Sequence, residues 1–238
     1  MQTDEKTWFD SHSDIYADQI MSIQRTFYEN AAALLNPYLP EDGVVLDLGN
    51  GGVINYDFRR LRQLDCADIV VNRSMAERYA DQKKIRFFQA DATNLAAVDS
   101  ECYDAVILQT VIHHLAGPTY RKTIRRVRSA IDECRRVLRP GGKLLIVEST
   151  VAPWFHAVER AVFPAMELFF RLCRFGYVYQ FSPAALRRLL TGTEGLELTC
   201  SEMVDVGPNI WIMGHSVPTR LTPCGVCFYA LQKNPAAF

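Results

Sequence analysis

The sequence predicts an α/β fold in which helices flank a doubly wound, mostly parallel sheet. Apolar, strand-like runs alternate with helix-like segments between residues 43 and 148, and this alternation is typical of βαβ units. The composition agrees, because 49% hydrophobic and 22% charged residues are ordinary values for a globular protein. A length of 238 residues favours one domain with a sizeable insertion.

Five strands are expected in this region, together with helices, two of which have clear sequence signals. A capping box, Ser74 with Glu77 three residues later, predicts that one helix starts at Ser74. A longer helix follows Pro118, because apolar residues recur there at steps of three and four until Leu138. The expected strands are residues 43–49, 67–71, 85–88, 103–108 and 143–147.

The second half has a different pattern. Residues 150–181 are aromatic-rich and helical in period, and Pro164 predicts a kink there. Ser182, followed by proline, predicts the start of another helix. Residues 196–206 and 225–233 have the pattern of two long strands. We therefore expect a helical cap (1–40), a core (43–148), an aromatic lid insertion (150–181) and a C-terminal helix with strands (182–238).

Charge and composition narrow the range of partners. The net charge is −1, so no overall field attracts nucleic acid or an anionic membrane, and we expect no nucleic-acid partner. Residues 161–178 are apolar but interrupted by charges, which argues against stable membrane insertion. Residues 1–10 lack the features of a signal peptide, which favours a cytoplasmic protein. The basic residues of 121–128 are interpreted as a solvated helix face.

The seven cysteines are expected to be reduced, buried thiols. An odd number scattered through predicted strands and helices does not resemble a disulfide framework. Cys224 and Cys227 have the spacing of a redox or zinc pair, but a second pair is missing. We therefore expect no metal site.

A glycine turn follows the first strand and is the first candidate binding site. Gly49 and Gly51 permit positive φ angles and close approach of a ligand to the backbone. A helix is expected after the turn, and its free amides would favour an anionic group. The spacing differs from the G-x-G-x-x-G of nicotinamide-binding proteins, because Ile54 stands at the third glycine position.

Four motifs in this order resemble the class I S-adenosylmethionine-dependent methyltransferases. Asp47, Gly49 and Gly51 match the acidic residue and glycines of the first motif, with Val53 in place of its last glycine. The other three motifs lie at residues 89–93, 103–115 and 132–144. The resemblance implies a Rossmann-like, seven-stranded, mostly parallel sheet with a C-terminal antiparallel hairpin and a helical lid insertion. It also implies S-adenosyl-L-methionine as the cofactor.

The resemblance further implies a set of cofactor-binding residues. Asp91 matches the aspartate that meets the adenine amine, although it could instead only form a turn. Asp47 could contact the cofactor or only anchor the glycine turn. Asn72 stands where the family has an acid after the second strand, and a neutral amide there would weaken binding by about 1–2 kcal/mol. The implied residues are Asp47, Gly49, Asn50, Gly51, Asn72, Asp91, Ala92 and Gln109.

Three histidines are candidate catalytic residues. His113 and His114 follow the fourth strand, at the edge where ligands bind in open α/β sheets. His156 lies in the predicted lid and is a candidate general base. A structural role stays open for each of them. Aromatic side chains supply the candidates for acceptor binding, with ordinary core or a dimer interface as the alternative: Tyr16, Trp154, Phe170 and Tyr179.

The expected reaction is methyl transfer to an oxygen or nitrogen of a small, aromatic or apolar metabolite. The Asn-Pro-Pro-Tyr type of loop that related enzymes use on base or glutamine amides is missing after the fourth strand. The expected partner is thus a small-molecule acceptor, and a homodimer remains open. Two alternatives remain: a cofactor-binding enzyme that catalyses a cyclisation or rearrangement, and a non-catalytic partner protein, which Asn72 and Val53 would favour.

Overall fold

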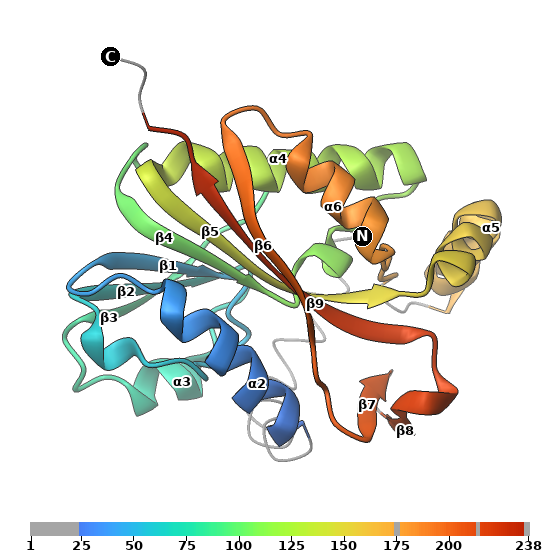
Figure 1. Cartoon of the computed structure of the whole chain (residues 1–238), viewed down its shortest axis with the longest axis horizontal. Coiled ribbons are helices and arrows are strands. Elements are labelled where there is room, and N and C mark those ends of the chain that lie inside the picture. The colour runs from blue at the N-terminus through green and yellow to red at the C-terminus, as the bar shows by residue number, and fades with distance from the viewer. Residues whose placement is uncertain (1–23, 174–176, 213–214, 236–238) are drawn as a thin grey trace.

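A seven-stranded sheet forms the centre of the protein (Figure 1). The computed structural model describes residues 24–173, 177–212 and 215–235. The strand order is β3-β2-β1-β4-β5-β9-β6, in which β9 runs antiparallel to β5 and β6 and the other neighbours are parallel. The strands are β1 (Val44–Leu48), β2 (Gln63–Asp68), β3 (Ile85–Gln89), β4 (Tyr103–Gln109), β5 (Leu138–Val151), β6 (Leu196–Val204) and β9 (Cys224–Lys233).

This topology confirms the predicted fold. The mostly parallel sheet and the C-terminal antiparallel hairpin of β6 and β9 are both present. A separate two-stranded sheet pairs β7 (Asn209–Ile212) with β8 (His215–Pro218). The carboxyl ends of β1, β2 and β4 therefore meet at one edge of the sheet, where α/β proteins bind ligands.

Helices cover both faces of the sheet, as Figure 1 shows. The apolar residues of β1 alternate, so that Leu46 and Leu48 pack with α4 and α6 while Val45 packs with α2. The α-helices are α2 (Arg25–Leu35), α3 (Arg73–Arg78), α4 (Tyr120–Val137), α5 (Pro153–Leu172) and α6 (Pro183–Thr191). Short 3-10 helices are η1 (Asn36–Tyr38), η2 (Phe58–Arg60), η3 (Ile112–Leu115) and η4 (Thr219–Leu221).

The helix after Pro118 and the helix after Ser182 both form as predicted. In α4 the buried residues Val127, Ile131 and Cys134 follow the expected spacing of three and four. In α6 the Ser182 side chain caps the helix by accepting the Ala185 N–H at 3.3 Å. Helix α5 forms in the predicted lid and continues through Pro164.

The prediction for the second strand was wrong by several residues. β2 ends at Asp68, whereas the prediction placed the strand at residues 67–71. The prediction failed because a buried carboxylate interrupts the apolar pattern of the strand. That carboxylate, Asp65, accepts hydrogen bonds from Arg86 at 2.6 and 2.8 Å and from the Tyr103 hydroxyl at 2.8 Å. These partners compensate the burial and lower the pKa of Asp65 against the opposing effect of desolvation.

Two further local predictions need correction. Helix α3 begins at Arg73, and its N-cap is Asn72, whose Oδ1 accepts the Met75 N–H at 3.1 Å; Ser74 does not cap it. No α-helix follows the glycine turn, which leads instead to η2 and then β2. Cysteines of the described chain are free, and Cys66, Cys134 and Cys227 are buried.

Candidate functional site

A cleft of about 180 Å³ opens at the carboxyl ends of β1, β2 and β4. Backbone segments line most of it, because each of these strands ends in a short turn at this edge. Side chains from α2 and α4 also reach it, namely Tyr28 and Arg126. Arg126 was predicted to lie on a solvated helix face, and its place in the cleft corrects that interpretation. The lining segments are 48–51, 68–70, 90–92 and 109–111, with Val53, Asn72, His114 and Leu115.

The glycine turn forms the floor of the cleft. Gly49 has a φ of +76°, and a Cβ atom there would lie 2.5 Å from Val111 Cγ2, so a larger residue cannot fit without displacement. Gly51 has a φ of +59°, but a Cβ atom there would meet nothing within 4 Å. The space next to Gly51 is therefore open to a ligand, whereas Gly49 packs against the neighbouring loop.

Asp47 lies beneath this turn and outside the cleft lining. Its Oδ2 accepts hydrogen bonds from the Tyr56 hydroxyl and from Asn50 Nδ2, both at 2.6 Å. Burial raises the pKa of Asp47 to about 7, although these two donors act in the opposite direction. The geometry fits the interpretation in which Asp47 anchors the turn, with Asn50 also bonded to the Val53 carbonyl at 3.0 Å.

Asp68 is a cleft residue that the sequence analysis missed. It ends β2, and its carboxylate accepts the Gly51 N–H at 2.8 Å and the Val70 N–H at 3.3 Å. Burial raises the pKa of Asp68, and these backbone donors oppose that effect. An acidic side chain therefore does stand at the end of the second strand, and the inferred replacement by Asn72 was wrong. Asn72 lines the cleft but caps α3 with its side-chain oxygen.

Asp91 combines the two roles considered for it. Its Oδ1 accepts hydrogen bonds from the Thr93 N–H at 2.8 Å and the Thr93 hydroxyl at 2.7 Å, so it forms a turn. Asp91 and Ala92 also line the cleft. A contact with a bound ligand is thus compatible with the turn.

Gln109 and Thr110 lie where β4 ends. Gln109 Oε1 is buried in the cleft wall and has no hydrogen-bond partner among the described residues. Thr110 has a φ of +56°, a strained conformation for a β-branched residue. Its N–H donates to the Val147 carbonyl at 2.7 Å, which holds the strained residue in place. Strain and an unpaired acceptor at one strand end are typical of a ligand-binding site.

A buried carboxylate fixes the orientation of His113. His113 Nδ1 lies 2.6 Å from Glu148 Oε1, and Glu148 is 1% exposed. The same carboxylate accepts the N–H groups of Ile112 at 2.6 Å and Ser149 at 2.8 Å. His114 lines the cleft, and its ring centroid lies 4.1 Å from that of His113. His113 thus lies next to a residue that lines the cleft, and Glu148 is a partner that the sequence did not reveal.

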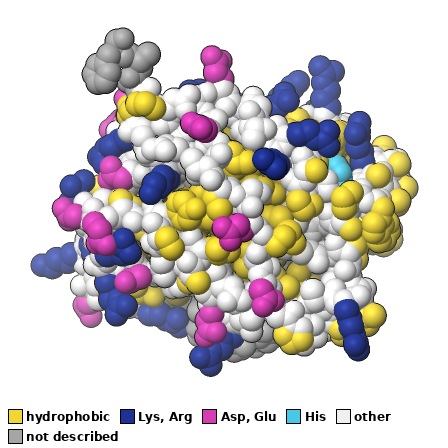
Figure 2. Space-filling view, in the orientation of Figure 1, with side chains coloured by type: hydrophobic (Ala, Val, Ile, Leu, Met, Phe, Trp, Pro, Cys, Tyr) yellow, Lys and Arg dark blue, Asp and Glu magenta, His cyan; other side chains and the backbone are white. Residues whose placement is uncertain are grey.

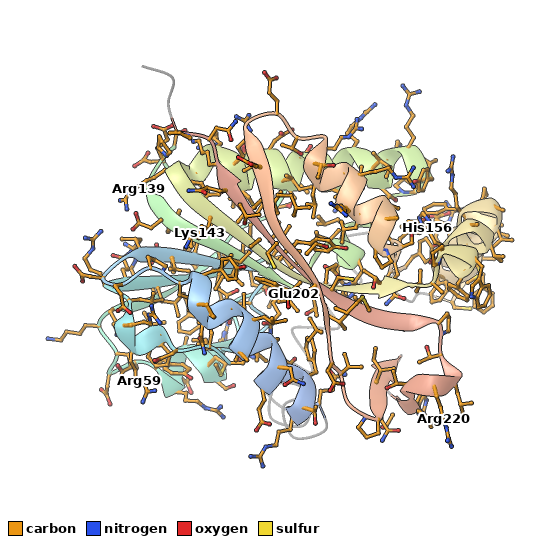
Figure 3. The ribbon with its side chains drawn as sticks, in the orientation of Figure 1. Arg59, Arg139, Lys143, His156, Glu202 and Arg220 are labelled. Carbon is orange, nitrogen blue, oxygen red and sulfur yellow. The ribbon has the colours of Figure 1, made fainter. Side chains whose placement is uncertain are left out.

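The lid residues predicted to bind the acceptor lie elsewhere. His156 is buried on the side of α5 that faces α6, as Figure 3 shows, with Nδ1 3.5 Å from the Ser182 hydroxyl. Burial, helped by Arg160 and Arg188, lowers the pKa of His156.

Two other lid residues belong to the same interior. Tyr179 is fully buried in a cluster with Phe163 and Phe181, and Phe170 packs on Tyr177. Trp154 is 64% exposed, so it does not belong to this cluster.

The predicted site residues thus fall into two groups. Neither His156 nor Trp154, Phe170 or Tyr179 lines the cleft, and Tyr16 lies outside the described residues. The cofactor residues do converge, since all except the underlying Asp47 line the cleft. In the described part of the chain, no group of His, Cys, Asp and Glu side chains has the arrangement of a metal site.

Comparisons with known proteins agree with this geometry. Residues 46–146 match the family described as "Methyltransferase domain". A demethylmenaquinone methyltransferase from Clavibacter sepedonicus is 33% identical over 76 residues, which is 32% of this chain and 27% of that protein. The matched stretch therefore spans about a quarter of that relative's length.

Two solved structures illustrate the range of this fold. The 1,6-didemethyltoxoflavin-N1-methyltransferase of Burkholderia thailandensis, with bound 1,6-didemethyltoxoflavin and S-adenosylhomocysteine, has a TM-score of 0.65 at 16% identity. The match covers 98% of this chain and 88% of that one. The [4+2]-cyclase SpnF has a TM-score of 0.57 at 16% identity, and the match covers 87% of this chain and 81% of that one. Residues 46–146 therefore match a methyltransferase domain, and the strand order and the cleft agree with that match.

Proposed function

We propose that this protein transfers a methyl group from S-adenosylmethionine to an oxygen or nitrogen atom of a small, aromatic or apolar molecule. The observation that carries the proposal is the cleft in which Asp68, the glycine turn and the unpaired Gln109 oxygen converge. This set of groups offers acceptors to hydroxyl and ammonium groups, and it leaves space next to Gly51. A cofactor with a ribose and an amino acid moiety fits such a site.

Each part of the cofactor has a candidate partner in the cleft. Asp68 would accept hydrogen bonds from the ribose hydroxyls, because an ionised carboxylate forms the strongest such bonds. Asp91 and Ala92 would face the adenine. Gln109 Oε1, which has no partner among the described residues, would accept from the ammonium group.

The cofactor supplies an electrophilic methyl group, and the side chains of the chain position the acceptor and receive its proton. We assign the proton-accepting role to His113. Glu148 already accepts two backbone N–H groups, and we assign it as the acceptor toward His113 as well, so that His113 Nδ1 carries the proton of their 2.6 Å hydrogen bond. This leaves His113 Nε2 as the basic nitrogen, in the manner of His–carboxylate pairs in general.

The relatives support a small acceptor. The Burkholderia neighbour holds a small molecule besides S-adenosylhomocysteine, and its name assigns methyl transfer to a nitrogen. The Clavibacter relative is named for demethylmenaquinone.

Calorimetric titration with S-adenosylmethionine and S-adenosylhomocysteine tests the first step. We expect micromolar binding of both to the folded protein. Asp68→Asn should weaken binding by about 10- to 100-fold, since hydrogen bonds to charged groups contribute roughly 1.5–3 kcal/mol. Asp99→Asn, at an exposed position outside the cleft, is the matched control. Failure of the folded wild-type protein to bind either ligand would refute the proposal and favour a non-catalytic partner protein.

The kinetics of substituted proteins test the assignment of His113. In the first acceptor assay that yields methylated product, His113→Gln should lower kcat by about 10²- to 10⁴-fold with little change in KM. Glu148→Gln should act in the same direction but less strongly, because Glu148 positions the imidazole. His215→Gln, which changes an exposed histidine in β8, should have no effect. Retained cofactor binding without methylated product would favour the cyclase alternative, a chemistry that the fold of SpnF also carries.

A further inference from the structure

Helix α5 has the reverse of the usual surface-helix pattern. A helix that borders water normally turns its apolar residues inward and its polar residues outward. In α5, polar His156 and Glu167 are among the three buried residues. The outward side chains are apolar, lie on one side of the helix, and are 42–75% exposed: Trp154, Val158, Val162, Leu168, Phe169 and Leu172.

The outward face of α5 also carries no negative charge. Glu159 and Glu167 are the acidic residues of this helix, and both turn toward the body of the protein. Glu159 lies near the Tyr177 hydroxyl at 3.5 Å, and burial raises its pKa to about 7. Arg160 and Arg171 are exposed beside the apolar stripe. The exposed charges of α5 are therefore positive.

Arg160 and Arg171 form a basic border beside the apolar stripe, and neighbouring helices add further basic residues to it. The first turns of α4 contact α5, since the Tyr120 ring lies 6.3 Å from Phe163 and 5.0 Å from the Arg160 guanidinium carbon. Neither the segment 120–131 nor α6 contains an acidic residue. Figure 2 shows Lys and Arg side chains gathered beside the hydrophobic patch of α5, with no Asp or Glu between them on this face. The exposed basic residues of the border are Arg121, Lys122, Arg125, Arg160, Arg171, Arg187 and Arg188.

We propose that the outward face of α5 docks on the surface of an anionic lipid bilayer. The apolar stripe would enter the boundary between headgroups and acyl chains, and the surrounding arginines would contact lipid phosphates. Trp154, 64% exposed near the start of the helix, is a residue type enriched at this boundary. Across the described residues, none of the helices combines the length and hydropathy of a membrane span, so the helix would lie in the plane of the interface.

Charge favours a bilayer over a second copy of the chain. A two-fold dimer through α5 would bring the basic borders of both copies into one interface, where the exposed charges of α5 offer no acidic partner. The whole chain has a net charge of −1, so the cluster of positive charge is local to this end. An anionic surface complements both the stripe and its border.

Vesicle flotation with the full chain tests the proposal independently of any methyl transfer. We expect binding to phosphatidylcholine vesicles that contain 30% phosphatidylglycerol, and much weaker binding to vesicles of phosphatidylcholine alone. Leu172→Glu and Trp154→Glu should each weaken binding at least tenfold. Leu221→Glu is the matched control, because Leu221 in η4 is 72% exposed, close to the 75% of Leu172, but lies outside α5.

The basic border is tested with charge-removing variants. Arg125→Gln and Arg171→Gln should each lower affinity for the anionic vesicles about fivefold, the effect of roughly 1 kcal/mol per basic residue near a charged surface. Lys83→Gln, exposed near α3 at the opposite end of the molecule, should leave affinity unchanged.

Three outcomes would overturn the proposal. The first is failure of the folded wild-type protein to bind either vesicle. The second is equal binding of the wild-type protein and the α5 variants. The third is a dimer in sedimentation velocity that Trp154→Glu dissociates, together with no vesicle binding, which would assign the face to a second copy of the chain.

Discussion

The cleft differs from residues 150–181, the predicted lid, in how its buried polar groups are surrounded. In the cleft, backbone amides of short turns satisfy the carboxylates, as the Gly51 N–H does for Asp68. In the lid, aromatic rings surround polar atoms that have no partner among the described residues: His156 Nε2, Glu159 Oε2, Glu167 Oε1 and the Tyr179 hydroxyl. Such atoms are costly, so the tight ring packing of the lid must offset them. The turns at strand ends therefore hold the polar groups of the cleft in place, whereas contacts between distant segments hold those of the predicted lid.

The largest expected difference is in the free energy of unfolding, between substitutions on the buried face and on the outward face of α5. Phe163→Ala should lower the free energy of unfolding by about 3–5 kcal/mol, because Phe163 is 2% exposed and contacts Tyr120, Tyr177 and Tyr179. Trp154→Ala on the outward face should change it by less than about 0.5 kcal/mol. Urea unfolding monitored by circular dichroism measures both. Equal losses would mean that the two faces of α5 are equally packed.

Asp47 provides a pH test of the cleft floor. Its pKa in the folded protein, about 7, lies above its ordinary value of 3.8, so the fold favours the neutral carboxyl. The contribution to stability is complete below pH 4 and is lost as the pH rises to about 7, a loss on the order of 4 kcal/mol at 1.4 kcal/mol per pKa unit. Asp47→Asn should remove this component of the pH dependence. Urea unfolding of both proteins at pH 4.5 and 7.5 gives the comparison, and parallel curves would contradict it.

The two glycines of the turn should respond unequally. Gly49→Ala should destabilise the fold by about 1–3 kcal/mol, because its Cβ would meet Val111 Cγ2 at 2.5 Å. Gly51→Ala should destabilise it by about 1 kcal/mol or less, since only its φ of +59° opposes the change. If Gly51→Ala nevertheless abolishes cofactor binding in calorimetry, the open space next to Gly51 is where the ligand lies. Unchanged binding would place the ligand elsewhere.

Asp91 tests ligand binding at the edge of the cleft. Asp91→Ala removes the acceptor of two Thr93 hydrogen bonds, so we expect S-adenosylmethionine binding to weaken about tenfold while the protein stays folded. Asn94→Ala, which changes an exposed residue of the same turn, is the control. Equal affinity of the wild-type and Asp91→Ala proteins would remove Asp91 from the binding site.

The sequence predicted the features that depend on local chain chemistry. The strands at 43–49 and 103–108, the cap at Ser182 and the glycine turn all follow from residue types at adjacent positions. Asp68 was missed because Asp65 interrupts the apolar run of β2, which made the strand hard to place. The burial of Asp65 is compensated by hydrogen bonds from Arg86, a residue of another strand.

The pairing of His113 and the orientation of the lid depend on contacts that are distant in sequence. Glu148 lies 35 residues from His113 and meets it only because β4 and β5 are neighbours in the sheet. For α5, apolar residues occur on every side, so the period alone did not show which face is buried. Burial shows that Trp154 lies outside and Phe163 inside.

Because no α-helix follows the glycine turn, the length of the connection between β1 and β2 affects the geometry of the cleft. Only residues 49–62 connect β1 to β2, close to the minimum of about a dozen that a parallel crossover needs. A connection this short has little slack to absorb a deletion, so a change of length would shift the pairing of Asp47 with Cys66 and of Leu48 with Ala67. A one-residue slip of β2 turns every side chain to the opposite face of the sheet. Asp68 would then leave Gly51, and an indel outside the cleft would act as an active-site mutation.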